Sequence, residues 1–174
     1  MHCGIVLTGT TEEASAVAFY DDGDLSVAAA AGNDDIVALV EDRRPSVVAL
    51  NAPPKRSMET EFRSGEEELV DEGHAVLPQG MRDQAVLERA DHLARSIEAA
   101  GVGTTVIESN ARIAGDILGL KGDADMERYG VDAADISSAR QYDAAILAIV
   151  AALYADNRCE DHGIVVPEDD VTTI

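Results

Sequence analysis

The stretch from Pro45 to Pro54 constrains the fold of this chain more than any other. Its centre, Val47 to Leu50, is an unbroken apolar run rich in β-branched residues, and the prolines that follow cannot continue a β-ladder. An apolar run without alternation is typical of a strand that is covered on both faces. The stretch therefore predicts a central parallel strand of an α/β sheet, with Asn51 at the end where such sheets open onto a ligand crevice.

Size and composition predict a single domain over residues 1–174. A chain of 174 residues that is 46% hydrophobic can bury a sizeable core. The segment from Met1 to Val6 has no basic region typical of a secretory signal, and the longest apolar run, 144–155, is too short to span a bilayer. We therefore expect a soluble cytoplasmic protein with no membrane partner.

The charge is strongly acidic, with 34 acidic and 13 basic residues and a formal net charge of −21. Acidic residues occur along the whole chain, which indicates a halophilic protein whose carboxylates stay solvated while dense salt screens their repulsion. A surface for basic partners is the alternative. The charge does not favour nucleic acid, although a small basic patch or divalent metals leave that partner open. We expect the fold to loosen as salt is withdrawn, measured by thermal unfolding from low to multimolar salt.

Histidine and cysteine residues near the two ends of the chain could together form a zinc site. His2 and Cys3 adjoin in the first strand, and Cys159 and His162 lie near the end of the chain. Adjacent residues in a strand point to opposite faces, which is a poor geometry for chelation, so two ordinary thiols are the alternative. The chain carries no glycine-rich nucleotide fingerprint, P-loop, nucleophile elbow or HExxH motif.

Hydrophobic periodicity and turn signals predict the order β-β-β-α-β-α-β-α. Strands are predicted at 3–8, 14–20, 25–30, 47–50 and 104–107, and the main helices at 33–43, 83–100 and 138–157. Asn33, Asn110 and Ser137 or Ser138 are the expected helix caps. The polar segment 53–82, with a short helix near 61–71, is expected to be a lid-like insertion, and a plain surface excursion is the alternative.

Three polar residues are predicted at the edge of the sheet where α/β proteins place their sites. Asn51 and Glu108 end two successive parallel strands, and Asp143 lies near the start of the last helix, on its apolar face. A carboxylate there is costly unless it is paired or bound to a metal. Glu108 and Asp143 could together hold Mg²⁺ or Mn²⁺, and a structural network with Arg140 or Arg112 is the alternative.

The predicted order is that of the ribonuclease H-like fold, an α/β fold with a mixed five-stranded sheet and helices on both faces. The chain resembles the DUF429 proteins, which are predicted nucleases of this fold, and looks like an acidic member of the haloarchaeal type. The resemblance covers nearly the whole chain and rests on motifs in a shared order, which are Gly4-Ile-Val-Leu7, Val47-Val-Ala-Leu-Asn-Ala-Pro53, Gly65-Glu-Glu-Glu-Leu69, Gly73, Val76-Leu-Pro78, Val106-Ile-Glu-Ser109, Tyr142-Asp-Ala144 and Ile164-Val-Val-Pro167.

The chain departs from this family at two of the residues that the resemblance implies for catalysis. The first-strand Asp of the family is Val6 here, and its central-strand Asp is Asn51. Glu108 and Asp143 keep carboxylates at the matched positions, and Glu66 is acidic where the family has Asp. Two-metal phosphodiester hydrolysis needs several carboxylates around two ions, and a valine cannot ligate a metal. The resemblance therefore implies a degraded site.

Two functions follow from these residues. The first is a metal-dependent nuclease in which Glu108 and Asp143 bind Mg²⁺ or Mn²⁺, Asn51 adds a carbonyl ligand, and Glu66 or Arg140 assists. The second is a catalytically inactive binding or scaffolding protein, with a homodimer as one form. Carboxylates that converge on an open cleft would favour the enzyme. Carboxylates neutralised by arginines or covered by side chains would favour the inactive relative.

Overall fold

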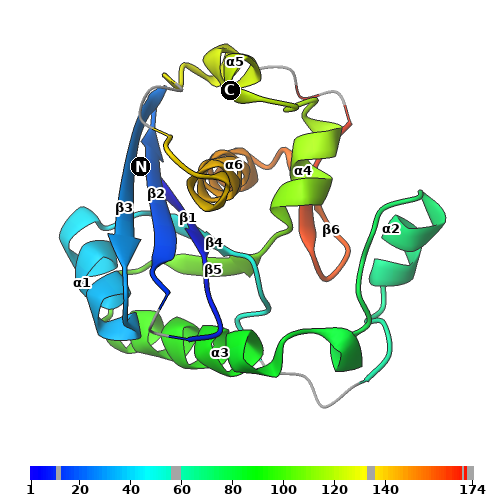
Figure 1. Cartoon of the computed structure of the whole chain (residues 1–174), viewed down its shortest axis with the longest axis horizontal. Coiled ribbons are helices and arrows are strands. Elements are labelled where there is room, and N and C mark those ends of the chain that lie inside the picture. The colour runs from blue at the N-terminus through cyan, green and yellow to red at the C-terminus, as the bar shows by residue number, and fades with distance from the viewer. Residues whose placement is uncertain (11–12, 56–59, 133–135, 170, 172–174) are drawn as a thin grey trace.

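A computed structural model describes residues 1–10, 13–55, 60–132, 136–169 and 171. Its centre is a five-stranded sheet in the order β3-β2-β1-β4-β5 (Figure 1). β1 pairs antiparallel with β2 and parallel with β4, and β4 pairs parallel with β5. The predicted mixed sheet is confirmed, with strands β1 (His2–Val6), β2 (Ser15–Asp21), β3 (Asp24–Ala30), β4 (Val47–Leu50) and β5 (Thr105–Glu108).

The apolar strand β4 is buried on both faces, as predicted. All four residues of β4 are buried, and their side chains alternate between two cores. Val48 and Leu50 face a core with helices α1 (Asn33–Arg43) and α3 (Gln84–Ala99). Val47 and Ala49 face a core with α4 (Ala111–Ile117) and α6 (Ala139–Ala155), so helices cover both faces of the sheet.

Helix α6 crosses β1 at Gly4 with very close backbone contact. A Cβ at Gly4 would lie 2.1 Å from the carbonyl oxygen of Ala144 and 2.3 Å from the backbone nitrogen of Ala148. Every residue of α6 from Ala144 to Leu153 is buried, as its nearly continuous apolar sequence predicts. No helix in the described ranges is long and apolar enough to cross a membrane.

The caps of the helices follow the sequence with one exception. The side chains of Asp83, Asn110 and Ser138 accept hydrogen bonds from the first backbone N–H groups of α3, α4 and α6. The prediction that Asn33 caps α1 is wrong, because the cap is Gly32 and Asn33 is the first residue of the helix. The amide of Asn33 instead exchanges hydrogen bonds with Arg89.

The structure adds elements that periodicity did not predict. Residues 121–136 lie outside the predicted strands and main helices, yet they contain α5 (Asp123–Met126) and the 3-10 helix η2 (Glu127–Tyr129), which buries Tyr129. The C-terminal apolar segment forms one strand of a hairpin, β6 (Cys159–Asp161) with β7 (Val165–Pro167). These short elements close the core beside α6 because they contribute buried apolar side chains to it.

The segment 53–82 packs on the domain through a small core of its own. It contains α2 (Glu66–Asp71) and the 3-10 helix η1 (Gln79–Met81), and α2 lies at the end of the molecule away from β3 (Figure 1). Side chains from this segment, α4 and the β6–β7 hairpin form that core, namely Leu69, Val76, Ile113, Ile164 and Val166. Residues 56–59 of this segment lie outside the described residues. Movement of the segment as a lid remains a prediction.

The two cysteines are free and lie in different surroundings. Cys3 is fully buried in the middle of the sheet, where its neighbours in the ladder are Phe19 and Val48. Cys159 begins β6 and is partly exposed. Burial raises the pKa of both thiols, that of Cys159 to about 12. In the described part of the chain no group of three or more His, Cys, Asp or Glu side chains is placed to hold a metal ion, so the zinc grouping does not form there.

Candidate functional site

Asn51 and Glu108 lie at the same edge of the sheet, as the parallel strands predict. Glu108 is the last residue of β5, opposite Leu50 in the ladder with β4, and Asn51 follows Leu50 directly. The next backbone hydrogen bond continues this pairing, because Ser109 N–H donates to the Leu50 carbonyl at 2.8 Å. The two polar side chains therefore border the crevice at the carboxyl ends of β4 and β5.

Glu108 belongs to a cluster of two buried glutamates and two partly buried arginines, the arginine–glutamate cluster (Arg63, Glu66, Arg82 and Glu108). Arg63 Nη2 lies 2.5 Å from Glu66 Oε1 and 2.6 Å from Glu108 Oε2. Arg82 Nη2 lies 2.7 Å from Glu66 Oε1, and its Nη1 lies 2.8 Å from Glu108 Oε1. Each arginine thus bridges both glutamates, and the formal charges within the cluster cancel.

The segment 53–82 supplies three of the four charged residues and further hydrogen bonds to them. Glu66 is 0% exposed and accepts a hydrogen bond from the backbone N–H of Arg63 at 2.8 Å and one from Gln79 Nε2 at 3.2 Å. Arg82 Nε donates to the Leu77 carbonyl at 2.9 Å. These bonds offset the desolvation of the buried charges and fix the segment against the end of β5.

Burial and pairing act in opposite directions on the two glutamates. Burial opposes ionisation of Glu66, but hydrogen bonds and positive charge from Arg63, with the charge of Arg82, hold the pKa of its carboxyl below its usual value. Burial raises the pKa of Glu108 above its usual value, and the charges of Arg63 and Arg82 offset only part of that rise. Glu66 is therefore the more firmly ionised member of the cluster.

Two buried oxygen atoms, one in the cluster and one next to it, lack a well-aligned hydrogen bond. Glu108 Oε2 is close to Arg63 Nη2 but out of line with its N–H bonds, so the contact is an ion pair without hydrogen-bond geometry. Ser109 Oγ has no partner among the described residues and is also buried. The hydrogen-bonding capacity of Glu108 and Ser109 is thus less completely used than that of Glu66.

Asn51 uses its amide to extend the pairing of β1 with β4. Its Oδ1 accepts from the Leu7 N–H at 2.9 Å, and its Nδ2 donates to the Leu7 carbonyl at 3.2 Å. An ionised aspartate could not donate the second bond, which gives this asparagine a structural reason. The role of Asn51 as a carbonyl ligand of a metal remains a prediction.

Asp143 is not part of the arginine–glutamate cluster. It lies near the start of α6, in the second turn, is half-buried, and has no hydrogen bond or ion pair within the described ranges. Burial raises the pKa of its carboxyl. Val6, at the position matched to the family's first-strand Asp, packs against the α6 core. The structure thus joins Glu108 with Glu66, and it pairs neither of them with Asp143.

The expected arginine partners of the network are wrong. Arg140 lies at the protein surface and pairs with Glu13 at 2.9 Å, and it also donates to the Ala14 carbonyl. Arg112 makes no ion pair with Glu108, whose partners are Arg63 and Arg82. A divalent cation does not fit Glu108 in this arrangement, because a guanidinium contacts each of its oxygens. Glu108 and Asp143 as metal ligands remain a prediction.

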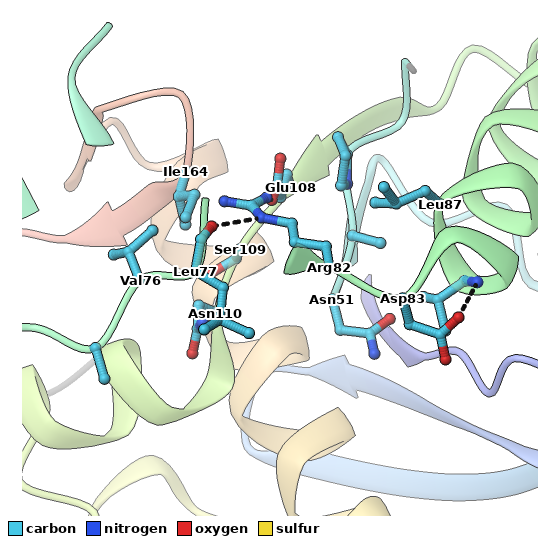
Figure 2. Close-up of a pocket in the computed structure, with 14 residues that line it drawn as sticks. Asn51, Val76, Leu77, Arg82, Asp83, Leu87, Glu108, Ser109, Asn110 and Ile164 are labelled. Atoms are coloured by element: carbon cyan, nitrogen blue, oxygen red, sulfur yellow. Dashed lines mark hydrogen bonds and ion pairs between the residues drawn. The ribbon is translucent and has the colours of Figure 1, made fainter. Parts of the chain in front are cut away.

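A cavity of about 310 Å³ lies next to the cluster, between the ends of β4 and β5 and the start of α3. Figure 2 shows Val76 and Ile164 on one side of the cavity, Leu87 on the other, and Arg82 between them. Its polar lining comes from Asn51, Arg82, Asp83, Glu108, Ser109 and Asn110. An apolar cavity with a few polar groups at this place in an α/β sheet is typical of a small-molecule site.

Comparison with known proteins supports the fold. No protein-family model matches the chain, and no curated protein matches it. The solved structure of T. thermophilus RuvC in complex with a Holliday junction substrate is similar, with a TM-score of 0.51 and 14% identity over 95% of this chain and 98% of that chain. The chain has the ribonuclease H-like fold, as the sequence predicted. At this identity the likeness carries no conclusion about activity.

The functional residues that sequence reasoning missed are Arg63, Gln79 and Arg82. All three lie in the polar segment 53–82, which lacks a strong periodicity that would place its side chains. One signal could have indicated them. In a chain with 34 acidic and 13 basic residues, cations close to the segment's acidic helix were candidate partners for a buried carboxylate.

Proposed function

We propose that this chain is a catalytically inactive relative of ribonuclease H-like nucleases that acts by binding a ligand or partner. The observation that carries the proposal is the arginine–glutamate cluster, in which Arg63 and Arg82 contact both carboxylate oxygens of Glu108. The guanidiniums supply the positive charge at the place where a nuclease would need a cation. Membership of the DUF429 family and adaptation to high salt are part of this proposal and rest on the sequence.

Electrostatics and topology explain why the cluster opposes metal binding. A cation at Glu108 would meet two arginines, and displacing either arginine would leave a buried glutamate without its partner. Asn51 and Val6 provide no carboxylate at the neighbouring strand ends. The remaining acid, Asp143, is outside the cluster, so a two-metal arrangement has too few ligands in the described residues.

The test is calorimetric titration with Mg²⁺ and Mn²⁺ at high salt, on the wild type beside Glu108→Gln and Asp143→Asn. The same proteins are incubated with single-stranded DNA, duplex DNA, RNA and a four-way junction. We expect neither specific metal binding nor cleavage. Metal binding that both substitutions abolish, together with cleavage of any of these substrates, would overturn the proposal.

A metal-dependent nuclease is the second candidate. The ribonuclease H-like fold favours it, as does Asp143, a half-buried carboxylate with no partner in the described part of the chain. In that function Glu108 and Asp143 hold one Mg²⁺ or Mn²⁺ after the arginines have moved. Titration of the wild type separates the two functions, because its arginines have to yield to the metal in the nuclease. Specific binding of Mg²⁺ or Mn²⁺ supports the nuclease, and its absence supports the inactive form.

A further inference from the structure

Two asparagines that line the cavity have amide orientations fixed by backbone hydrogen bonds. Asn110 Oδ1 accepts from the N–H groups of Arg112 at 3.0 Å and Ile113 at 3.2 Å, as the cap of α4. Asn51 Oδ1 accepts from Leu7 N–H. Because the oxygens are committed to these donors, the position of each amide nitrogen is fixed as well, and neither side chain can flip without losing its bonds.

Both amides keep N–H groups that no residue in the described ranges accepts from. Asn51 Nδ2 donates one hydrogen to the Leu7 carbonyl and retains the other. No described residue accepts a hydrogen bond from Asn110 Nδ2, which leaves two. The two residues follow β4 and β5, neighbouring parallel strands, and line one cavity (Figure 2). Two residues that line the cavity therefore have spare donors, which a ligand that carries acceptors can use.

The rest of the lining selects against a charged ligand. The charges of Arg82 and Glu108 are matched within the arginine–glutamate cluster, so neither is left for a ligand. Asp83 adds a negative charge at the rim, and the chain as a whole carries −21. A phosphate or carboxylate would be repelled, whereas a neutral ring would meet the apolar side chains of Val76, Leu87 and Ile164.

We propose that this cavity binds a small, uncharged, flat molecule with two carbonyl acceptors, of the pyrimidinedione class. A volume of about 310 Å³ is at the lower end of the range for small-molecule sites and suits one ring with a small substituent. The carbonyls accept from the amides of Asn51 and Asn110, and the ring lies between apolar walls. This inference rests on the proposed binding function and names the chemistry of its ligand.

The experiment measures binding of uridine, cytidine and uridine 5′-monophosphate to the full chain by calorimetry and ligand-observed NMR. Cytidine replaces one ring carbonyl with an amine, which would place a donor against a donor. We expect uridine to bind about tenfold more tightly than cytidine. In the cytidine complex one hydrogen bond is lost, because the amine of the ligand and an amide N–H of the protein are both donors. The monophosphate should bind more weakly than uridine at low salt, with a difference that shrinks as salt is added.

The matched variants act on Asn110, because its cap can be kept while its amide nitrogen is removed. Asn110→Ser and Asn110→Asp both retain a cap acceptor for α4, so the fold should persist. Each should weaken uridine binding about tenfold or more. Asn157→Asp, at an exposed residue outside the cavity lining, controls for the added charge and should leave binding unchanged.

Three outcomes would overturn the inference. These are no binding of uridine at millimolar concentration, equal affinity for uridine in the folded Asn110→Ser variant, and tighter binding of the monophosphate than of the nucleoside. The failure of this inference is distinct from the failure of the proposed function. Cleavage with specific metal binding would overturn the inactive function whatever uridine does, whereas absent uridine binding without cleavage removes only the ligand.

Discussion

Two buried regions of this molecule are organised by opposite physics. Where α6 crosses β1, apolar residues and a glycine allow two backbones to touch. At the carboxyl end of β5, two buried glutamates pair with two partly buried arginines, and the four charges are stable only as a matched set. The first region tolerates no added volume, and the second tolerates no missing partner. The comparison shows that burial alone does not determine which substitutions a position tolerates.

Removing one charge from the matched set should have the largest effect. Arg82→Met leaves Glu66 and Glu108 with Arg63 as their shared partner, so a buried carboxylate loses its compensation. We expect a loss of about 3–5 kcal/mol in the free energy of unfolding, measured by chemical denaturation. Arg95→Met is the control, because Arg95 is exposed and pairs with Asp91 at the surface, and it should cost less than about 1 kcal/mol. Equal costs for the two variants would contradict the buried pairing.

Adding volume at the helix crossing should have the next largest effect. In Gly4→Ala the new methyl group would lie 2.1 Å from the carbonyl oxygen of Ala144, so α6 has to move away from β1. We expect a loss of about 1–3 kcal/mol, or failure to fold. Gly122→Ala is the matched control, because apart from its chain neighbours no described residue lies within 4 Å of its added Cβ, and its φ of 177° is extended backbone. A wild-type melting temperature for Gly4→Ala would refute the close crossing.

Restoring the family's carboxylate at the strand end should cost less. Asn51→Asp loses the bond from Nδ2 to the Leu7 carbonyl and sets a negative charge beside that oxygen. We expect a loss of about 1–3 kcal/mol at neutral pH, which shrinks as the new carboxyl is protonated below about pH 4. Denaturation curves at neutral pH and below about pH 4 measure this loss of stability. Asn157→Asp is the control for the added charge. A variant as stable as the wild type would show that the amide bridge contributes nothing.

The smallest expected effect is a pH dependence at the hairpin that holds α2. His162 lies between Glu68, 2.9 Å from its Nδ1, and Glu160, 3.1 Å from its Nε2. Burial lowers the pKa of His162, but the two carboxylates outweigh burial and leave it raised. The stabilisation is therefore complete below pH 6.5 and is lost as pH rises through the folded-state value.

The measurement is the free energy of unfolding between pH 5.5 and pH 8.5 for the wild type and His162→Gln. The stability advantage of the wild type should be greatest at the acidic end, amount to at most about 1 kcal/mol, and disappear at the basic end. Glu68→Gln should reduce the advantage by removing one partner. A difference between the proteins that is constant with pH would assign His162 a packing role only.

The sheet and its covering helices could be predicted because local patterns determine them. The apolar run at 47–50 and the apolar periodicity of 83–100 each specify an element without reference to the rest of the chain. The proximity of Asn51 and Glu108 could also be predicted, because the carboxyl ends of neighbouring parallel strands lie at the same edge of a sheet. Residues 121–136 were missed because burial of Tyr129 depends on contacts with β2 rather than on its neighbours in sequence.

The content of the site could not be predicted to the same extent. Glu66 and Glu108 were named from the sequence as catalytic residues, yet their arginine partners come from a segment without strong periodicity. Nothing local distinguishes Arg82, which bridges two buried carboxylates, from Arg95, which lies on the surface one helix turn beyond the middle of α3. To predict which residue pairs with a buried charge, one has to know the path of the chain between the strands.

The two cysteines differ in exposure, so their reactivity with a thiol reagent can report local unfolding of two different parts of the protein. Cys3 is 0% exposed at the centre of the sheet, whereas Cys159 is partly exposed at the C-terminal hairpin. A thiol reagent can modify Cys3 only when β1 separates from its neighbours, and Cys159 only needs the hairpin to fray. The two labelling rates would thus read the opening of the sheet and the opening of its edge separately, without any introduced probe.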